Sequence, residues 1–312
     1  MGKIAFLFSG QGAQYLGMGK DLFENIDVCK KVFEDADGIL GFPISNMCFE
    51  GPEEDLNRTE NTQPAILTTS IAALKALESF HIKADITAGL SLGEYSALVC
   101  SGVMGFKEAV ALVKKRGKYM QEAVPEGIGT MAAIMGLNYT YMEKICSDCK
   151  SFGIVELSNV NCPGQLVIGG HIEAVKAACA MAKDKGARKI VELSVSGPFH
   201  TSMLKSAAEK LEEELSRISI NEFSIPVVTN VTGEIIEKVQ DIKPYLRKQV
   251  MSTVLFEKSI NTMIESGVDV FIEIGPGRVL SGFVKKINRK ALTLNVQDIK
   301  SLNTTVEKLK NR

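Results

Sequence analysis

The sequence lacks tryptophan, long apolar runs and an excess of charge of either sign. No stretch approaches the roughly 18 consecutive apolar residues that a membrane-spanning helix needs, so we expect no membrane span. The 36 Lys and Arg residues are balanced by 37 Asp and Glu residues, for a net charge of -1, which argues against a nucleic-acid partner. With 312 residues, 45% of them hydrophobic, the chain can instead bury a large core in one or two domains.

The cysteine pattern argues against a disulfide framework. Seven cysteines, an odd number, are scattered at positions 29, 48, 100, 146, 149, 162 and 179, which is typical of reduced thiols in the cytoplasm. The first apolar run, Ile4–Phe8, is too short for the core of a signal peptide. Cys146 and Cys149 form one C-x-x-C, but no second Cys or His pair follows at the spacing of a zinc site. We therefore predict a cytoplasmic protein with no metal and no cofactor.

Hydrophobic periodicity predicts a large α/β domain built from both ends of the chain. Strands alternate with amphipathic helices, as in a parallel sheet covered by helices. The predicted strands are Ile4–Phe8, Ile86–Leu90, Val227–Asn230 and Val270–Ile274, and the predicted helices lie at about 20–37, 62–80, 106–123, 201–217 and within 241–265. We assign residues 1–127 and 197–312 to this domain, which we expect to be α/β-hydrolase-like with a parallel sheet.

Residues 128–196 have a different pattern and predict a small inserted domain. Strands are expected at Met131–Met135, Ile154–Asn159, Gln165–Ile168 and Lys189–Val195, with helices at about 139–150 and 171–185. The resulting order, βαββαβ, is that of the ferredoxin-like unit. An inserted domain creates a cleft against the larger one, and ligands usually bind in such clefts.

The strongest local signal for chemistry is the G-x-S-x-G at Gly89–Gly93, between a predicted strand and a predicted helix. In this arrangement a serine turns sharply out of the strand, and the flanking glycines allow the backbone to approach closely. Ser91 is then an exposed nucleophile, and the Leu92 N–H at the start of the helix faces any oxyanion that forms there. The alternative is an inert, glycine-rich turn between strand and helix.

A serine nucleophile needs a base, and the chain contains three histidines. His81 ends a predicted helix, and His171 opens the second helix of the small domain. His200 lies where the chain returns from the small domain to the large one, at the mouth of the predicted cleft. We therefore predict His200 as the base if Ser91 is the nucleophile.

The glycine-rich turn Ser9–Gln14 follows the first predicted strand. The turn does not match the dinucleotide-binding pattern G-x-G-x-x-G, because Tyr15 stands at the third glycine position. It does not match the phosphate-binding loop G-x-x-x-x-G-K either, because Met18, not Lys, follows Gly17. Besides a plain turn, the remaining interpretation is that Gln11 contributes a second oxyanion-hole N–H.

Arg116 is the exceptional cation of the predicted helix 106–123. The four lysines of this helix lie away from its apolar stripe, whereas Arg116 falls beside Ala109 and Met120 at the stripe's edge. A guanidinium turned partly inward needs an anionic partner. Periodicity leaves two equal alternatives, a protein carboxylate or a substrate carboxylate.

Several motifs together resemble one enzyme family. They are Gly10–Gly12, Asn61–Ala65, Gly89–Tyr95, Lys115–Gln121, Asn161–Gln165, Pro198–His200 and Gly275–Gly277. In this order, from about residue 4 to 290, the sequence resembles the malonyl-CoA:acyl-carrier-protein transacylases. Seven ordered blocks are a far more specific match than G-x-S-x-G alone.

The resemblance implies a ping-pong transfer of malonyl from malonyl-CoA to acyl carrier protein in fatty acid biosynthesis. Ser91, activated by His200, would carry the malonyl group as an ester, while the N–H groups of Gln11 and Leu92 form the oxyanion hole. Arg116 would hold the malonyl carboxylate. In the family the histidine is oriented by a main-chain carbonyl, and Gln249 matches the position that supplies it.

The resemblance also implies the rest of the substrate pocket. The matched positions that would contact substrate, besides Arg116, are Gln11, Gln63, Met120, Asn161 and Phe199. With Phe199 before His200, the sequence resembles the malonyl-selecting members of the family, because a bulky ring at this position would crowd a branched acyl group.

Two positions depart from the family pattern. Members commonly have His before the serine, where this chain has Leu90, and often have Pro a few residues after the matched Gln, where it has Thr253. The first change makes the pocket more apolar and bears on acyl specificity. The second bears on the placement of the Gln249 carbonyl.

Other functions remain open at this point. A hydrolase could use the same serine and histidine with water as the acceptor, and a carrier-binding scaffold would leave Ser91 inert.

Acyl carrier proteins are acidic, so a basic docking surface is expected. The candidate clusters are Lys183, Lys185, Arg188 and Lys189, and Lys285, Lys286, Arg289 and Lys290, although a solvated helix face is the favoured interpretation of each cluster. The sequence does not distinguish a fatty-acid from a polyketide carrier, and we take a monomer as the working expectation.

Overall fold

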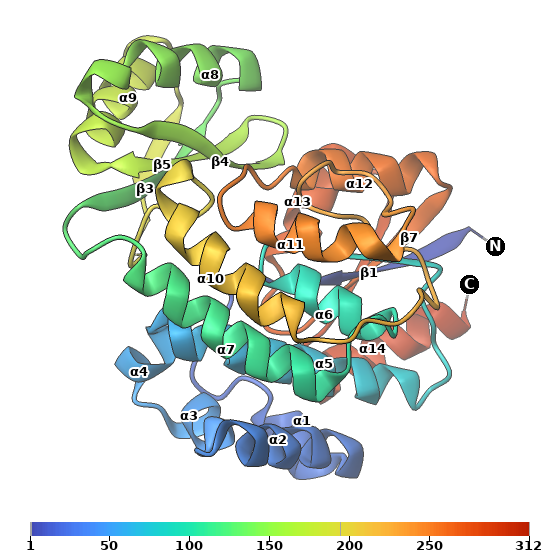
Figure 1. Cartoon of the computed structure of the whole chain (residues 1–312). Coiled ribbons are helices and arrows are strands. Elements are labelled where there is room, and N and C mark those ends of the chain that lie inside the picture. Colours follow the sequence, from blue (N-terminus) through green and yellow to red (C-terminus); the bar gives the residue numbers. More distant parts are fainter. Residues whose placement is uncertain (1, 194, 312) are drawn as a thin grey trace.

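The computed structural model describes residues 2–193 and 195–311 and contains two separate four-stranded sheets (Figure 1). Met1 and Arg312, at the ends of the predicted large domain, and Ser194, in the predicted strand Lys189–Val195, lie outside the described residues. Within the described part of the chain, no helix is both long enough and apolar enough to cross a lipid bilayer.

The larger sheet is parallel and buried on both faces. Its strands are β1 (Lys3–Phe8), β2 (Ile86–Gly89), β7 (Val268–Ile274) and β8 (Leu292–Val296), in the order β2-β1-β7-β8. Alternate residues of β1 enter different cores: Phe6 and Phe8 join one apolar cluster, and Ala5 and Leu7 join another. Helices therefore cover both sides of this sheet, as expected for a parallel sheet.

The first cluster contains the helices of the N-terminal half, α1 (Lys20–Asn25), α2 (Asp27–Leu40), α3 (Ile44–Glu50), α4 (Glu53–Asn57), α5 (Thr59–Glu78), α6 (Gly93–Cys100) and α7 (Phe106–Glu122). Helix α5 is central and buried along almost its whole length. Helix α7 approaches it closely at Gly117, where a Cβ would lie 2.5 Å from the Thr59 carbonyl oxygen. This glycine brings the neighbouring Arg116 against α5.

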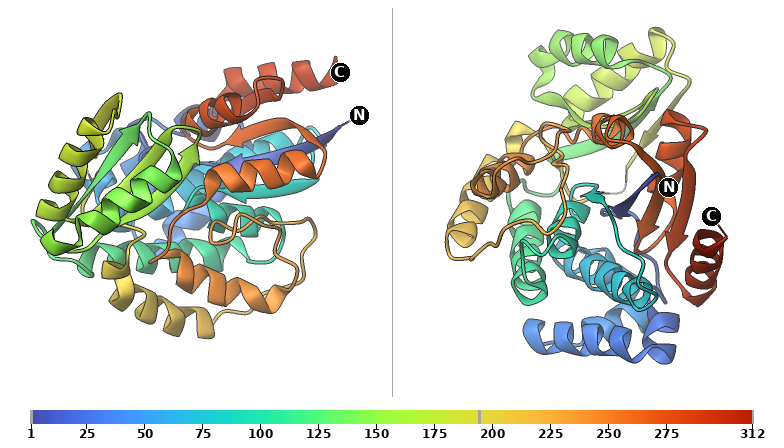
Figure 2. Two further views of the ribbon diagram at one scale, coloured as in Figure 1. Left: turned by 90° about the horizontal axis from the view of Figure 1, so that it is seen from above. Right: turned by 90° about the vertical axis from the view of Figure 1, so that its right-hand side faces the viewer.

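The remaining helices follow the small sheet in the chain. They are α10 (Lys205–Ser216), α11 (Ile242–Gln249), α12 (Phe256–Glu265), α13 (Val279–Ile287) and α14 (Ile299–Lys310), with short 3-10 turns at Ser202–Leu204 and Val239–Asp241. Helices α12 and α13 contribute to the second cluster. Both chain ends lie on the side of the molecule away from the small sheet (Figures 1 and 2).

The smaller sheet lies between α7 and α10 in the chain and has the predicted element order. It runs β3 (Gly129–Met135), α8 (Tyr139–Asp148), a 3-10 turn (Lys150–Phe152), β4 (Val155–Cys162), β5 (Gln165–His171), α9 (Ile172–Asp184) and β6 (Lys189–Glu192). The strands are antiparallel in the order β4-β5-β3-β6. Ala132 and Ile134 pack beneath α8 and α9. Met131 and Ala133, on the other face of β3, join the first apolar cluster, which covers one face of the larger sheet.

One predicted strand is wrong. Val227–Asn230 forms only isolated bridges, Thr87 with Val227 and Val228 with Ile235. The main-chain N–H of Asn230 donates instead to the Glu94 carboxylate at 3.0 Å, and the chain then turns back through Gly233. A side-chain acceptor thus takes the N–H that a continuing ladder would have used.

Several predicted boundaries also differ. The predicted helix 20–37 is divided at Ile26, whose extended backbone separates α1 from α2. The described part of the predicted strand Lys189–Val195 is paired only over Lys189–Glu192. Sequence periodicity missed α3, α4, α13, β8 and α14 altogether.

Candidate active site

Ser91 stands at a sharp turn between β2 and α6. Its backbone is left-handed, with φ of 53°, a conformation that costs energy for a residue with a side chain. A Cβ on Gly89 would lie 1.9 Å from the main-chain carbon of Gly93, and a Cβ on Gly93 would lie 2.1 Å from the carbonyl oxygen of Phe8. Both positions therefore require glycine, which explains the G-x-S-x-G spacing.

His200 lies beside this serine, on the segment that returns from the small sheet. Its Nε2 is 2.7 Å from Ser91 Oγ, and its Nδ1 is 2.8 Å from the main-chain oxygen of Gln249. Because a carbonyl oxygen can only accept, Nδ1 carries the proton, and the lone pair of Nε2 is free to accept the serine proton. Burial, aided by the charge of Arg116, lowers the pKa of His200 to about 4, so the imidazole is neutral at pH 7.

Thr253 does not prevent this contact, since its hydroxyl donates to the Leu157 carbonyl oxygen at 2.7 Å. The other two histidines have different surroundings. His171 accepts a hydrogen bond from the Ile154 N–H at the edge of the small sheet, and His81 is exposed at the end of α5.

Two main-chain N–H groups are available near Ser91. Gln11, in the turn after β1, and Leu92, at the start of α6, line the same cavity as the serine. Within residues 2–193 and 195–311, neither N–H donates to a protein acceptor. Unpaired donors and a helix N-terminus at one point suit a developing negative charge.

Arg116 is buried with 1% of its surface exposed, and its guanidinium reaches the serine. Nη1 donates to Gln63 Oε1 at 2.8 Å, and Nη2 donates to Gln249 Oε1 at 3.0 Å and to Ser91 Oγ at 3.2 Å. All three acceptors are uncharged, and in the described part of the chain no carboxylate forms an ion pair with Arg116. Burial lowers the pKa of Arg116 from its ordinary value.

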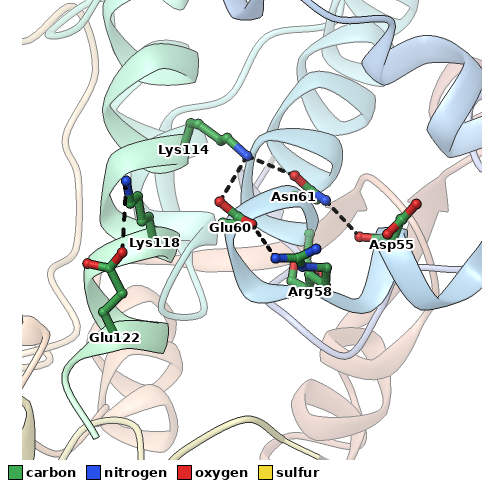
Figure 3. Close-up of polar contacts among 8 residues, drawn as sticks. Asp55, Arg58, Glu60, Asn61, Lys114, Lys118 and Glu122 are labelled. Carbon is green, nitrogen blue, oxygen red and sulfur yellow. Dashed lines mark hydrogen bonds and ion pairs between the residues drawn. The ribbon is translucent and has the colours of Figure 1, made fainter. Parts of the chain in front are cut away.

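Figure 3 shows two lysines of α7, Lys114 and Lys118, with their polar partners. Lys114 lies 3.3 Å from Glu60, which also pairs with Arg58 at 3.1 Å, and Lys118 lies 3.8 Å from Glu122. Protein carboxylates thus neutralise exposed cations of this helix but leave the buried one unpaired. Of the two alternatives that periodicity left open, a protein carboxylate in direct contact with Arg116 is not found among the described residues.

A cavity of about 610 Å³ joins these groups and lies between the two sheets. Its lining includes Gln11, Gln63, Leu90, Ser91, Leu92, Arg116, Met120, Asn161, Phe199 and His200, together with Met131, Ala133 and Val167 from the small sheet. All sequence-predicted site residues except Gln249 therefore meet in one cavity, and Gln249 lies behind it. In the described chain no group of three or more His, Cys, Asp or Glu side chains is arranged to hold a metal ion.

Sequence reasoning missed two residues behind the serine, Asn230 and Glu94. The Asn230 side chain accepts from the Ser91 N–H at 2.6 Å and donates to the Gly89 carbonyl at 2.7 Å, so it clamps both sides of the turn. Glu94 accepts from the Asn230 N–H at 3.0 Å. A signal for Asn230 existed, because it ends the predicted strand Val227–Asn230, and ligands bind beyond the carboxyl ends of the strands in such sheets.

Gln249 also does more than predicted from the sequence. Besides its main-chain oxygen, which holds His200, its side chain donates from Nε2 to the Ser91 carbonyl at 3.0 Å and to Glu94 Oε2 at 2.6 Å. Its Oε1 accepts from Arg116. One residue therefore contacts the candidate nucleophile, base and anion-binding group.

Comparison with known proteins gives consistent results. The acyl transferase domain family matches residues 5–309. The chain is 48% identical over 311 residues to a malonyl CoA-acyl carrier protein transacylase of Bacillus subtilis, covering 99% of this chain and 98% of that protein. It is also similar to the crystal structure of a malonyl CoA-acyl carrier protein transacylase from Clostridium perfringens, with a TM-score of 0.97, 51% identity and coverage of 99% and 98%. A malonyl-transacylase solved in complex with a type II PKS acyl-carrier protein matches with a TM-score of 0.95, 41% identity and coverage of 98% and 99%.

Proposed function

Because this chain belongs to the malonyl-CoA:acyl-carrier-protein transacylases within the acyl transferase family, we propose that it transfers malonyl through a malonyl-serine intermediate. The observation that carries this proposal is Arg116, a buried guanidinium with only uncharged partners, 3.2 Å from Ser91 Oγ. A substrate that places a reactive carbonyl at Ser91 and a free carboxylate at Arg116 satisfies both groups at once. Malonyl thioesters have this form.

In the first half-reaction Ser91 Oγ attacks the thioester carbonyl of malonyl-CoA, and its proton passes to His200 Nε2. The oxyanion accepts hydrogen bonds from the Gln11 and Leu92 N–H groups. Collapse of this intermediate breaks the carbon–sulfur bond, and the departing sulfur takes the proton from Nε2. The products are coenzyme A and a malonyl ester on Ser91.

The second half-reaction reverses these steps with a different thiol. The phosphopantetheine thiol of acyl carrier protein gives its proton to His200 Nε2 and attacks the ester carbonyl. The same N–H groups hold the oxyanion, and Ser91 Oγ leaves with the proton. The enzyme returns to its starting state, so malonyl-CoA, the donor, and acyl carrier protein, the acceptor, bind in turn.

Selectivity for malonyl over acetyl follows from the burial of Arg116. An acetyl group would leave the guanidinium without an anion, whereas a malonyl carboxylate would form a two-pronged pair with it. Gln63 and Gln249 orient the guanidinium by accepting from Nη1 and Nη2. Met120, Asn161 and Phe199 form the rest of the acyl pocket in this proposal.

Intact-protein mass spectrometry after brief incubation with malonyl-CoA or acetyl-CoA tests the proposal. Wild type should gain a malonyl adduct, Ser91→Ala should gain none, and Arg116→Ala should shift the adduct toward acetyl. Steady release of coenzyme A without an adduct or a carrier requirement would favour a thioester hydrolase instead. No reaction at all would make Ser91 a structural turn.

The proposed partner is an acyl carrier protein of fatty acid synthesis, docking on a basic surface. Five predicted cations, Arg188, Lys189, Lys285, Lys286 and Arg289, line a cavity of about 600 Å³ between the start of β6 and the end of α13. None of the five forms an ion pair within the described residues. The other three predicted cations, Lys183, Lys185 and Lys290, do not line this cavity.

Charge reversal tests this docking surface. Lys189→Glu should raise the KM for carrier protein and leave the KM for malonyl-CoA unchanged, while Lys176→Glu, at an exposed lysine paired with Glu173, serves as the control. Equal KM values in the two variants would remove this surface from the proposal. Parallel assays with fatty-acid and polyketide carriers would distinguish the two partners.

The domain assignments belong to the same proposal. We propose that residues 128–196 form a ferredoxin-like domain inserted into an α/β-hydrolase-like domain of residues 1–127 and 197–312. The antiparallel order β4-β5-β3-β6 and the parallel order β2-β1-β7-β8 support it, as does the placement of the cavity between the two sheets.

A further inference from the structure

Two buried groups of opposite charge lie close to Ser91 without touching each other. Glu94, in the first turn of α6, is 0% exposed, and Arg116 is 1% exposed. Neither belongs to an ion pair within the described residues. Such charges are costly to bury unless each is compensated.

The side-chain amide of Gln249 connects them. Its Nε2 donates to Glu94 Oε2 at 2.6 Å, and its Oε1 accepts from Arg116 Nη2 at 3.0 Å. The amide dipole thus has its positive end toward the carboxylate and its negative end toward the guanidinium. This orientation favours both charges and holds them one amide group apart.

The hydrogen bonds of Glu94 fit its ionised form. Oε2 accepts from two donors, the Asn230 N–H and Gln249 Nε2. Oε1 is buried and has no hydrogen-bond partner in the described chain, so the charge of the carboxylate is compensated through Oε2 and by the nearby guanidinium of Arg116. Burial raises the pKa of Glu94 above its ordinary value, and its hydrogen bonds and the charge of Arg116 oppose this rise.

We propose that Glu94 is the counter-ion of Arg116, kept at a distance by Gln249 so that the guanidinium stays available to a substrate carboxylate. A direct ion pair would occupy the guanidinium and would have to break in every turnover. An uncompensated guanidinium would instead destabilise the empty enzyme. Glu94 therefore tunes acyl selectivity through Arg116 without touching substrate, an inference that rests on the proposed malonyl transfer.

The arrangement predicts that removing the buried charge of Glu94 raises the selectivity for malonyl over acetyl. Because Glu94 partly neutralises Arg116 and repels a second carboxylate, removing its charge should favour malonyl over acetyl. Glu94→Gln keeps an oxygen that can accept from Asn230 and Gln249. We expect its ratio of kcat/KM for malonyl-CoA to kcat/KM for acetyl-CoA to rise on the order of tenfold, the size expected for one buried charge acting across a short distance.

Glu273→Gln is the matched control. Glu273 is 1% exposed, and its two oxygens accept from the main-chain N–H groups of Leu280 and Ser281 at 3.0 and 2.7 Å, at the start of α13. It is a buried carboxylate of the same kind that has no bond to Gln249 or Arg116. Its loss of charge should leave the malonyl-to-acetyl ratio unchanged.

A double-mutant cycle with Arg116→Met separates a charge effect from a folding defect. Glu94→Gln should lower the midpoint of thermal unfolding in the wild-type background but not in the Arg116→Met background, where no buried cation needs compensation. If Glu94→Gln alone does not fold, the double variant should recover soluble protein. An equal fall of the unfolding midpoint in both backgrounds would overturn the proposal.

The kinetic outcomes are equally distinct. A proportional loss of malonyl and acetyl transfer in Glu94→Gln would give Glu94 a purely structural role and overturn the inference. A wild-type enzyme that forms no malonyl adduct would instead overturn the proposed function, whatever the behaviour of the Glu94 variant.

Discussion

Lowering the pH is a direct test of the buried base. Burial and the nearby Arg116 charge lower the pKa of His200 from 6.5 to about 4, against the opposing effect of its hydrogen bond to the Gln249 carbonyl. Between these values the unfolded chain binds a proton at this position and the folded chain does not. The free energy of unfolding should therefore fall as the pH drops from about 6.5 to 4, and a shift of about 2.5 pKa units corresponds to about 3 kcal/mol.

Urea unfolding at a series of pH values measures this effect against His200→Asn. Asparagine is the matched replacement because it tolerates the left-handed backbone at this position, where φ is 61°. The stability of wild type relative to the variant should fall by about 3 kcal/mol between pH 7 and pH 4, while the titration of other groups cancels in the difference. A difference that does not change with pH would refute the reasoning.

The same pKa predicts the acid limb of the reaction. Since kcat/KM reports the ionisation of the free enzyme, its acid limb should lie near pH 4, because His200, with a pKa of about 4, becomes protonated there. An acid limb near pH 6.5 would mean that the imidazole is solvated in the working enzyme.

Further predictions concern the turn at Ser91. Gly89→Ala places a Cβ 1.9 Å from the main-chain carbon of Gly93 and should lower the free energy of unfolding in urea by about 3 kcal/mol or more. Gly38→Ala, inside α2 with nothing within 4 Å of its Cβ, is the control and should raise it by about 0.5–1 kcal/mol. Similar effects at both positions would contradict the close-approach argument. Asn230→Ala leaves the Ser91 N–H and the Gly89 carbonyl without their partner, so stability should fall by about 2–4 kcal/mol and rapid-quench acylation of Ser91 should slow at least about tenfold. An unchanged acylation rate would show that the clamp does not position the serine.

The turn at Ser91 and the position of His200 beside it could be predicted from the sequence for a physical reason. Gly89 and Gly93 are required by backbone approaches of 1.9 and 2.1 Å, and such close contacts leave a fixed spacing of glycines. His200 was found because only three histidines exist and one falls where the chain re-enters the larger layer. Arg116 was found because helical periodicity places it at the edge of an apolar stripe.

The polar groups behind the serine were not accessible in this way. Glu94 and Asn230 are 136 residues apart, and their hydrogen bond exists only because β2, α6 and the segment after Val227 converge. The same bond made the predicted strand Val227–Asn230 wrong, since local apolar pattern does not show that a carboxylate will take a main-chain N–H. Helix α14 was missed too, although Asp298 and Ser301 cap its start in both directions.

The contacts of Gln249 limit how this active site can change. Its main-chain oxygen contacts His200, the proposed base, and its amide contacts the Ser91 backbone and Arg116, the proposed selectivity residue. A shift at the end of α11 would therefore move three functions together, and substitutions around it should combine non-additively. New acyl specificity should arise more readily on the opposite wall of the cavity, at Met131, Ala133 or Val167, where side chains of the small sheet line the cavity without bonding to the proposed catalytic groups.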